Sequence, residues 1–288
     1  MSTDIARVAV VGGGLMGTGI AEVAARAGLD VVVREVDVAA GRRSHQAIER
    51  SMARAVKAGK LSVAERAAAR DRIRLTTEWD DVADRQLVIE AVPEDEPLKL
   101  EVFSTLDKVV EDPRAILASN TSSIPIMKLA MATQRRDKVV GLHFFNPVPV
   151  LHLVELVPSL LTGDDTVERA ERFAATQLGK RVIRSKDRAG FIVNALLIPY
   201  LLSAMRMLES GFATAEDIDA GMVEGCNHPM GPLALTDLIG LDTTMAVAQS
   251  LYGEFKEPLY APPPLLLRMV EAGLLGRKAG RGFYEYRS

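Results

Sequence analysis

The fold is decided by residues 8–28, VAVVGGGLMGTGIAEVAARAG, which begin as a β-branched run and pass through glycines into an apolar helical pattern. Gly12, Gly14 and Gly17 have the spacing G-x-G-x-x-G, with Leu15 and Met16 between the last two. The first glycine permits a tight turn, the second lets the backbone approach a pyrophosphate, and the third lets helix and strand pack closely. The following helix would offer unpaired N–H groups to phosphates. The stretch therefore predicts the first strand, turn and helix of a dinucleotide-binding unit.

A second apolar strand follows at residues 31–33, with Glu35 at its end. This acid lies roughly 20 residues past the glycines, where an adenine-ribose ligand is expected. Its carboxylate would accept a hydrogen bond from the ribose 2′-hydroxyl and repel a 2′-phosphate, which favours NAD. The neighbouring Arg34, Arg42 and Arg43 could soften that preference, so NADP stays an alternative.

Strand and helix patterns alternate as far as about residue 182, which predicts an α/β fold with a Rossmann-type, doubly wound, mainly parallel sheet. The helical stretch 38–70 is expected to break at Gly59, with a capping box at Ser62 and Glu65. From residue 189 onward nearly everything is helical in pattern. We expect a Rossmann NAD-binding domain at 1–186 and an all-helical domain at 187–288 that binds substrate and forms a homodimer.

Composition narrows the class of protein. Hydrophobic residues at 48% and charged residues at 25% are ordinary for a globular protein, and a net charge of -3 argues against nucleic-acid binding. The single cysteine, Cys226, forms no internal disulfide. The start MSTDIAR has no secretory pattern, and the apolar stretch 191–205 is too short and too interrupted to span a bilayer. We expect a cytoplasmic protein that does not enter membranes.

Residues 141–155, GLHFFNPVPVLHLVE, form a second informative stretch. One strand ends near His143, Pro147 and Pro149 occupy the connection, and a second strand carries Glu155 back. This return would place the carboxylate beside the imidazole. A histidine held in one tautomer by a carboxylate is a suitable base for removing a proton from an alcohol. The alternative is an ordinary packing histidine at a strand end.

Two further sets of polar residues are candidates for ligand binding. Residues 120–123, NTSS, follow a strand, where open α/β sheets bind ligands, although turn and cap roles are the alternative. The helix after Glu35 is strongly basic against the single acid Glu49, which favours either a solvated face or a site for a phosphorylated ligand. Its basic residues, with one just beyond, are Arg42, Arg43, Arg50, Arg54, Lys57 and Lys60.

Taken together, the chain resembles the short-chain L-3-hydroxyacyl-CoA dehydrogenases, and most closely the bacterial 3-hydroxybutyryl-CoA dehydrogenases. The likeness runs nearly end to end through VGGGLMGTGIA, VIEAVPED, ASNTSS, GLHFFNPVPV with Glu155, GFIVNALL, HPMGPLALTDLIGLD and GRKAGRGFYEY. It implies reversible, nicotinamide-dependent oxidation of 3-hydroxybutyryl-CoA to acetoacetyl-CoA, with no metal ion. It leaves open whether the pathway is fatty-acid oxidation, aromatic-acid breakdown, or polyester and butanoate metabolism.

The resemblance also implies roles residue by residue. His143 matches the general base and Glu155 its orienting partner, Ser122 matches the serine that hydrogen-bonds the reacting oxygen, and Asn194 helps to position substrate. The implied cofactor residues are Gly12, Gly14, Leu15, Met16, Gly17, Glu35, Glu94, Lys99, Asn120 and Asn146. The implied contacts to coenzyme A phosphates are Ser51, Arg54 and Lys57.

Two positions depart from the family pattern, because Ala189 replaces a usual proline and Ala279 a common threonine. Three rivals also remain. An L-gulonate 3-dehydrogenase would share the Ser–His–Glu–Asn set but leave the basic helix without phosphates. A dehydrogenase of carrier-protein thioesters would dock a protein through that helix. A non-catalytic lens crystallin resembles the same superfamily, but the intact catalytic set argues against it.

Overall fold

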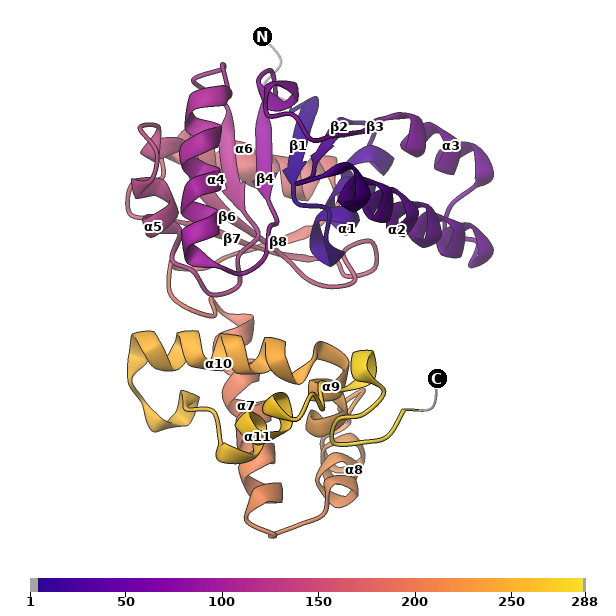
Figure 1. Cartoon of the computed structure of the whole chain (residues 1–288), viewed down its shortest axis with the longest axis vertical. Helices are drawn as coiled ribbons and strands as arrows, with labels where there is room; N and C mark the ends of the chain where they lie inside the picture. Colours follow the sequence, from indigo (N-terminus) through magenta and orange to yellow (C-terminus); the bar gives the residue numbers. More distant parts are fainter. Residues whose placement is uncertain (1–4, 287–288) are drawn as a thin grey trace. The chain divides into compact units, whose positions relative to one another are not determined.

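The computed structural model of the chain describes residues 5–286, so residues 1–4 of the MSTDIAR start lie outside the described part. The chain divides into two units, the first ending at Asp187 and the second beginning at Arg188. Figure 1 shows both units. The first is a sheet with helices on its faces, and the second is entirely helical in its regular elements. The predicted α/β fold with a following helical domain is confirmed. No helix within the described range combines the length and apolarity that crossing a bilayer requires.

The first unit is built on one eight-stranded sheet in the order β3-β2-β1-β4-β5-β6-β7-β8. All neighbouring strands run parallel except β6 and β7, which are antiparallel. The order reverses between β1 and β4, which is the switch point where doubly wound sheets bind ligands. The strands are β1 (Arg7–Val11), β2 (Asp30–Arg34), β3 (Ile73–Thr76), β4 (Leu87–Glu90), β5 (Ile116–Ser119), β6 (Val139–Phe144), β7 (Leu153–Pro158) and β8 (Arg181–Arg184).

The helices of this unit follow local start and stop signals. Asp37 caps α2 by accepting a hydrogen bond from Ala40 N at 2.7 Å, and the predicted capping box of Ser62 and Glu65 opens α3. Gly59 has a positive φ of 69° between them, which confirms the predicted break. The helices are α1 (Leu15–Arg26), α2 (Val38–Lys57), α3 (Val63–Asp71), α4 (Glu96–Val109), α5 (Ile126–Met131) and α6 (Asp164–Arg172). Shorter helical turns span Asp80–Val82, Arg136–Lys138 and Phe173–Gln177.

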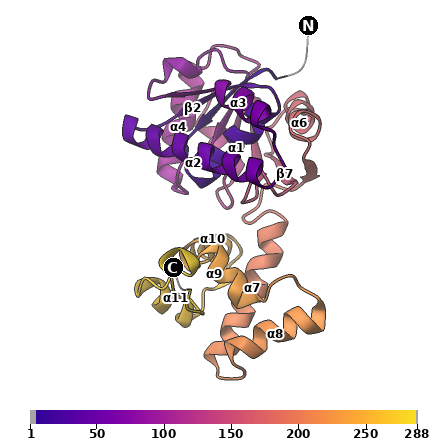
Figure 2. The same ribbon diagram turned by 90° about the vertical axis from the view of Figure 1, so that its right-hand side faces the viewer.

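The second unit holds five α-helices in its described part (Figure 2): α7 (Val193–Glu209), α8 (Ala215–Cys226), α9 (Pro232–Ile239), α10 (Leu241–Phe255) and α11 (Pro264–Glu271). Two short 3-10 turns span Pro258–Tyr260 and Arg277–Ala279. The apolar faces of these helices enclose a core of their own.

Two buried carboxylates join segments of the second unit. Asp219 accepts hydrogen bonds from the first N–H groups of α9, and Asp237 accepts from Phe283 N and Tyr284 N. A Cβ on Gly282 would lie 2.0 Å from a carboxylate oxygen of Asp237. The terminal glycine-rich motif is therefore needed for packing in this unit.

Candidate active site

His143 and Glu155 are paired across the one antiparallel junction of the sheet. Strand β6 carries His143, β7 carries Glu155, and the register sets the two residues directly opposite each other. Pro147 and Pro149 lie in the connection between the strands. His143 Nδ1 is 2.7 Å from Glu155 Oε2, the imidazole is only 5% exposed, and the carboxylate is fully buried. The pairing that the sequence predicts is present.

The second ring nitrogen of His143 faces Ser122. A carboxylate accepts hydrogen bonds, so Nδ1 carries the proton that it shares with Glu155, and in the neutral ring Nε2 then keeps its lone pair. Ser122 Oγ lies 3.1 Å from Nε2. Phe145 packs against the imidazole with ring centroids 4.6 Å apart. The ring is therefore held on two sides, with a basic nitrogen directed at a half-buried hydroxyl.

Glu94 anchors the loop that carries Ser122. Its Oε1 accepts hydrogen bonds from Thr121 Oγ1 at 2.5 Å, Ser122 N at 3.0 Å and Ser123 Oγ at 2.8 Å. Burial alone would raise the pKa of Glu94, but the Lys99 ammonium and these hydrogen bonds outweigh burial and lower it. The carboxylate thus determines where the Ser122 hydroxyl lies relative to His143.

Behind Glu94 lies a buried ion pair that the sequence reasoning missed. Lys99 Nζ is 2.6 Å from Glu90 Oε1 and 3.3 Å from Glu94 Oε2, and both Lys99 and Glu90 are almost fully buried. Ser119 Oγ donates to the other oxygen of Glu90 at 2.6 Å. Burial raises the pKa of Glu90, against the effect of Lys99. The sequence did carry a signal for this pair, because Glu90 ends the strand 87–90, whose other three residues are apolar. A buried carboxylate without a partner is costly, so a partner for Glu90 was to be expected.

The glycine turn has room for a ligand at one position only. Gly12 has a φ of 92°, and a Cβ on Gly17 would lie 1.8 Å from the carbonyl oxygen of Gly12. Gly14, the N-cap of α1, differs because a Cβ there would meet no atom within 4 Å. Its small size is not required by the protein's own packing. Open space over the start of a twelve-residue helix, beside exposed Leu15, suits the pyrophosphate of a dinucleotide.

Glu35 stands at the edge of a cavity of about 450 Å³ near the end of β2. Its Oε1 accepts hydrogen bonds from Gly13 N at 3.0 Å and Ser44 Oγ at 2.6 Å. Trp79 and Arg34 line the same cavity, with the guanidinium 4.0 Å from the indole centroid. A flat aromatic wall next to a carboxylate fits an adenosine, and with the open glycine turn the residues present fit NAD.

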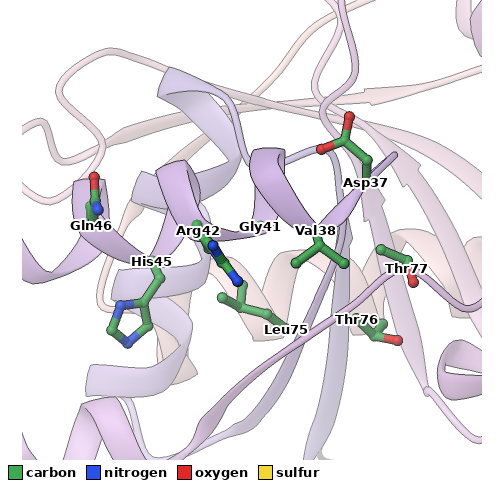
Figure 3. Close-up of a pocket in the computed structure, with 9 residues that line it drawn as sticks. All are labelled: Asp37, Val38, Gly41, Arg42, His45, Gln46, Leu75, Thr76 and Thr77. Atoms are coloured by element: carbon green, nitrogen blue, oxygen red, sulfur yellow. The ribbon is translucent and has the colours of Figure 1, made fainter.

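The arginines near Glu35 are engaged in different ways. Arg34 also donates to Thr77 O at 3.2 Å, and burial lowers its pKa although Glu35 and Glu78 oppose the shift. Arg42 lines a different cavity of about 500 Å³, formed by the first turns of α2 and the end of β3 (Figure 3). Glu35 is not among the residues that line this second cavity.

A third cavity, of about 200 Å³, brings part of the basic helix to the connection after His143. Ser51 and Arg54 line it together with Arg50 and the exposed Asn146, and residues from the first half of α1 complete it. Lys57 does not line this cavity, whereas Arg50 does, a residue expected as part of the basic helix but not as a contact to coenzyme A.

The remaining predicted residues lie in packed or separate positions. Asn120 is buried, and its Oδ1 accepts a hydrogen bond from Phe144 N at 2.9 Å, so it ties the end of β5 to the end of β6. Met16 lies partly buried against the core of the first unit. Asn194 belongs to the first turn of α7 in the second unit, and its contact with substrate stays a prediction.

Comparison with known proteins identifies the domains. Residues 7–188 match the family model of the 3-hydroxyacyl-CoA dehydrogenase NAD binding domain, and residues 190–286 match that of the C-terminal domain. The chain is 60% identical over 286 residues to a 3-hydroxybutyryl-CoA dehydrogenase of Mycobacterium tuberculosis, covering 99% of this chain and 100% of the relative. The match to an NAD-binding domain agrees with the fit of the glycine turn and Glu35, and NAD is the cofactor.

Solved structures agree with this assignment. The crystal structure of M. tuberculosis FadB2 superposes with a TM-score of 0.98 at 60% identity, over 99% of this chain and 100% of that one. The structure of (S)-3-hydroxybutyryl-CoA dehydrogenase PaaH1 from Ralstonia eutropha superposes with a TM-score of 0.93 at 46% identity, over the same shares of the two chains. The family resemblance that the sequence predicts is confirmed.

Proposed function

The chain belongs to the 3-hydroxyacyl-CoA dehydrogenase family, and from this premise we propose that it interconverts 3-hydroxybutyryl-CoA and acetoacetyl-CoA. The observation that carries the proposal is the His143 imidazole held between Glu155 and Ser122. A ring whose Nδ1 proton is shared with a buried carboxylate presents a basic Nε2. That nitrogen is the group an alcohol oxidation needs for the departing proton.

In the proposed oxidation, His143 Nε2 takes the proton of the substrate's 3-hydroxyl, and in the reduction it returns that proton to the ketone oxygen. Glu155 balances the positive charge that the imidazole acquires. Ser122, 3.1 Å from Nε2, is placed to hydrogen-bond the same oxygen. NAD, when bound, supplies the acceptor for the hydride that leaves C3. General acid–base assistance of this kind contributes roughly 10²- to 10⁴-fold in rate.

The other predicted residues bind rather than react. In this proposal Glu94, Lys99, Asn120 and Asn146 border the nicotinamide half of the cofactor, and Asn194 orients the acyl-CoA. Ser51 and Arg54 hold coenzyme A phosphates, with Lys57 near the end of the same helix. Support comes from the cavity that Ser51, Arg54 and Asn146 share. Hydroxyl and guanidinium groups are suited to phosphate oxygens.

The direct test is reduction of acetoacetyl-CoA followed by loss of reduced-nicotinamide absorbance, with NADH and NADPH in parallel. The wild-type protein is expected to turn over with NADH. His143→Gln is expected to bind NADH normally and to lose about 10²- to 10⁴-fold in kcat. A folded His143→Gln protein with wild-type turnover would remove His143 from the mechanism.

The rival substrates call for a charge-reversed variant. Arg54→Glu is expected to raise the KM for acetoacetyl-CoA strongly and to leave NADH binding unchanged, because in this proposal Arg54 contacts the phosphates of the acyl-CoA and not those of NADH. Turnover of L-gulonate in preference to acetoacetyl-CoA, with no effect of Arg54→Glu, would favour the L-gulonate 3-dehydrogenase alternative. Turnover of a carrier-protein thioester alone would favour the alternative of a dehydrogenase that acts on carrier-protein-bound substrates.

We also propose that the protein is a cytoplasmic homodimer joined through its second unit. That unit exposes large apolar side chains, which include Leu196 at 72% and Phe212 at 79%. Exposed apolar surface of this kind is typical of an interface. Light scattering at micromolar concentration is expected to give about twice the chain mass of 31.2 kDa. A monomeric mass would contradict the dimer, and recovery in a membrane or secreted fraction would contradict the cytoplasmic assignment.

A further inference from the structure

Ser44 connects three elements of the cofactor-binding region, and none of the roles described above includes it. It lies in the second turn of α2 with only 2% of its surface exposed. Its Oγ is 2.6 Å from Glu35 Oε1, 2.8 Å from Gly13 O and 3.1 Å from Ala40 O. A hydroxyl carries one proton, and the shortest of these contacts is the one to the carboxylate.

Gly13 completes the group, although it is not one of the three glycines in the G-x-G-x-x-G spacing. Its N–H donates to Glu35 Oε1 at 3.0 Å. A Cβ at this position would lie 2.4 Å from Ser44 Oγ and 2.7 Å from Glu35 Oε1. No side chain fits at position 13 while the three residues keep this arrangement. The third consecutive glycine therefore has a local reason, which is the approach of Ser44 and Glu35 to the turn.

The two donors occupy one oxygen of Glu35, and the residue lines the same cavity as Trp79. Within residues 5–286, no donor forms a hydrogen bond with Oε2. Arg34, the nearest cation in sequence, is stacked on Trp79 and bonded to Thr77 O. A carboxylate fixed through one oxygen cannot turn away from an incoming group, so it accepts a ribose hydroxyl well and repels a phosphate strongly.

We propose that Ser44 is a positioning residue that fixes the Glu35 carboxylate and thereby sets the preference for a cofactor with an unphosphorylated adenine ribose. The inference rests on NAD binding and needs the proposed acyl-CoA activity for one readout only. Ser44 does not belong to the G-x-G-x-x-G pattern. It is also distinct from Glu35, the acid at the end of the second strand that the sequence identifies.

The experiment measures dissociation constants of NADH and NADPH for the wild type and for Ser44→Ala, Ser44→Thr and Gln46→Ala. Trp79 is the chain's single tryptophan and lines the same cavity as Glu35, so its fluorescence reports binding directly. Gln46 is an exposed neighbour on α2 and serves as the matched control. Unfolding temperature is recorded for each variant.

Ser44→Ala is expected to weaken NADH binding about tenfold and NADPH binding less, so that the ratio of the NADH to the NADPH dissociation constant rises. Ser44→Thr keeps the hydroxyl and is expected to restore the wild-type ratio, and Gln46→Ala is expected to change nothing. The kcat for acetoacetyl-CoA at saturating NADH should stay at the wild-type value. An NADH constant within about twofold of the wild type in Ser44→Ala would overturn the inference. An equal loss in Ser44→Thr would do the same.

A double-mutant cycle separates positioning from a general structural effect. In a Glu35→Gln background the carboxylate is absent, so adding Ser44→Ala is expected to leave the NADH-to-NADPH ratio unchanged. An undiminished effect of Ser44→Ala in that background would show that Ser44 does not act through Glu35. A wild-type protein that binds NADH but does not reduce acetoacetyl-CoA would reject the proposed function, while this binding experiment would still decide the role of Ser44.

Discussion

Replacing Glu155 with glutamine tests the role of this buried carboxylate in the mechanism. The carboxylate is fully buried and lies 2.7 Å from His143 Nδ1. Glutamine has nearly the same shape and keeps an oxygen that can accept the Nδ1 proton, but it carries no charge. The substitution therefore removes the electrostatic partner of the imidazole and leaves a neutral hydrogen bond in its place.

The expected magnitude follows from this geometry. A nitrogen–oxygen distance of 2.7 Å sets the centres of the two charged groups about 4 Å apart. At an effective dielectric constant of about 20, opposite unit charges at that separation attract by about 4 kcal/mol. A neutral hydrogen bond retains about 1 kcal/mol. The imidazole becomes positive only as it takes the substrate's proton, so about 3 kcal/mol is lost in the transition state, on the order of 10²-fold in kcat.

The assay is steady-state oxidation of 3-hydroxybutyryl-CoA at saturating NAD, the direction in which the imidazole gains its charge, with the KM of each substrate measured separately. We expect kcat to fall and both KM values to stay near those of the wild type, because Glu155 contacts His143 and not the bound ligands. Asp107→Asn is the control, since it removes an ion pair with Arg135 that includes no predicted catalytic residue. A folded Glu155→Gln protein with a kcat within about threefold of the wild type would refute the reasoning.

Two further predictions concern cofactor binding and pH. Gly17→Ala is expected to abolish NADH binding or folding, because its Cβ would lie 1.8 Å from Gly12 O; calorimetric titration and thermal unfolding check this, and tight binding would contradict it. Burial would raise the pKa of Glu94, but Lys99 and the Thr121, Ser123 and Ser122 hydrogen bonds lower it below the ordinary 4.5. The ionised carboxylate thus stabilises the fold above that value, and the stabilisation disappears as the pH falls through the lowered pKa. In urea unfolding, the stability difference between wild type and Glu94→Gln should shrink from neutral to acidic pH, and a constant difference would contradict the assignment.

The sequence was most informative where local chemistry and strand geometry require the same arrangement. Pro147 and Pro149 cannot continue a ladder, so the chain between His143 and Glu155 had to turn back, and antiparallel register then set the two side chains opposite each other. The glycine turn and Glu35 were predictable for the same reason, since their conformations and spacing follow from the chain itself. In these places a short segment determines its own structure.

Side chains whose roles depend on packing between distant segments were not predictable. Glu90, Lys99 and Glu94 lie within ten positions, yet which of them is buried depends on how α4 packs against the ends of β4 and β5. Sequence reasoning placed Lys99 at the cofactor on resemblance alone, which stays a prediction, and it did not foresee that the ammonium is bonded to a buried carboxylate.

The role of Ser44 was not predictable either, because it too depends on packing between distant segments. A serine in the second turn of an amphipathic helix is typical of a solvated or weakly packed position, and no sequence pattern distinguishes it. Its significance arises because α2 crosses next to the glycine turn and brings its hydroxyl to Glu35. Gly13 was the available signal in the sequence. The dinucleotide spacing does not require a glycine at this position, so its small size indicates that another part of the chain lies close to it. In this chain, Gly13 marks the place where α2 approaches the predicted acidic ligand of the cofactor.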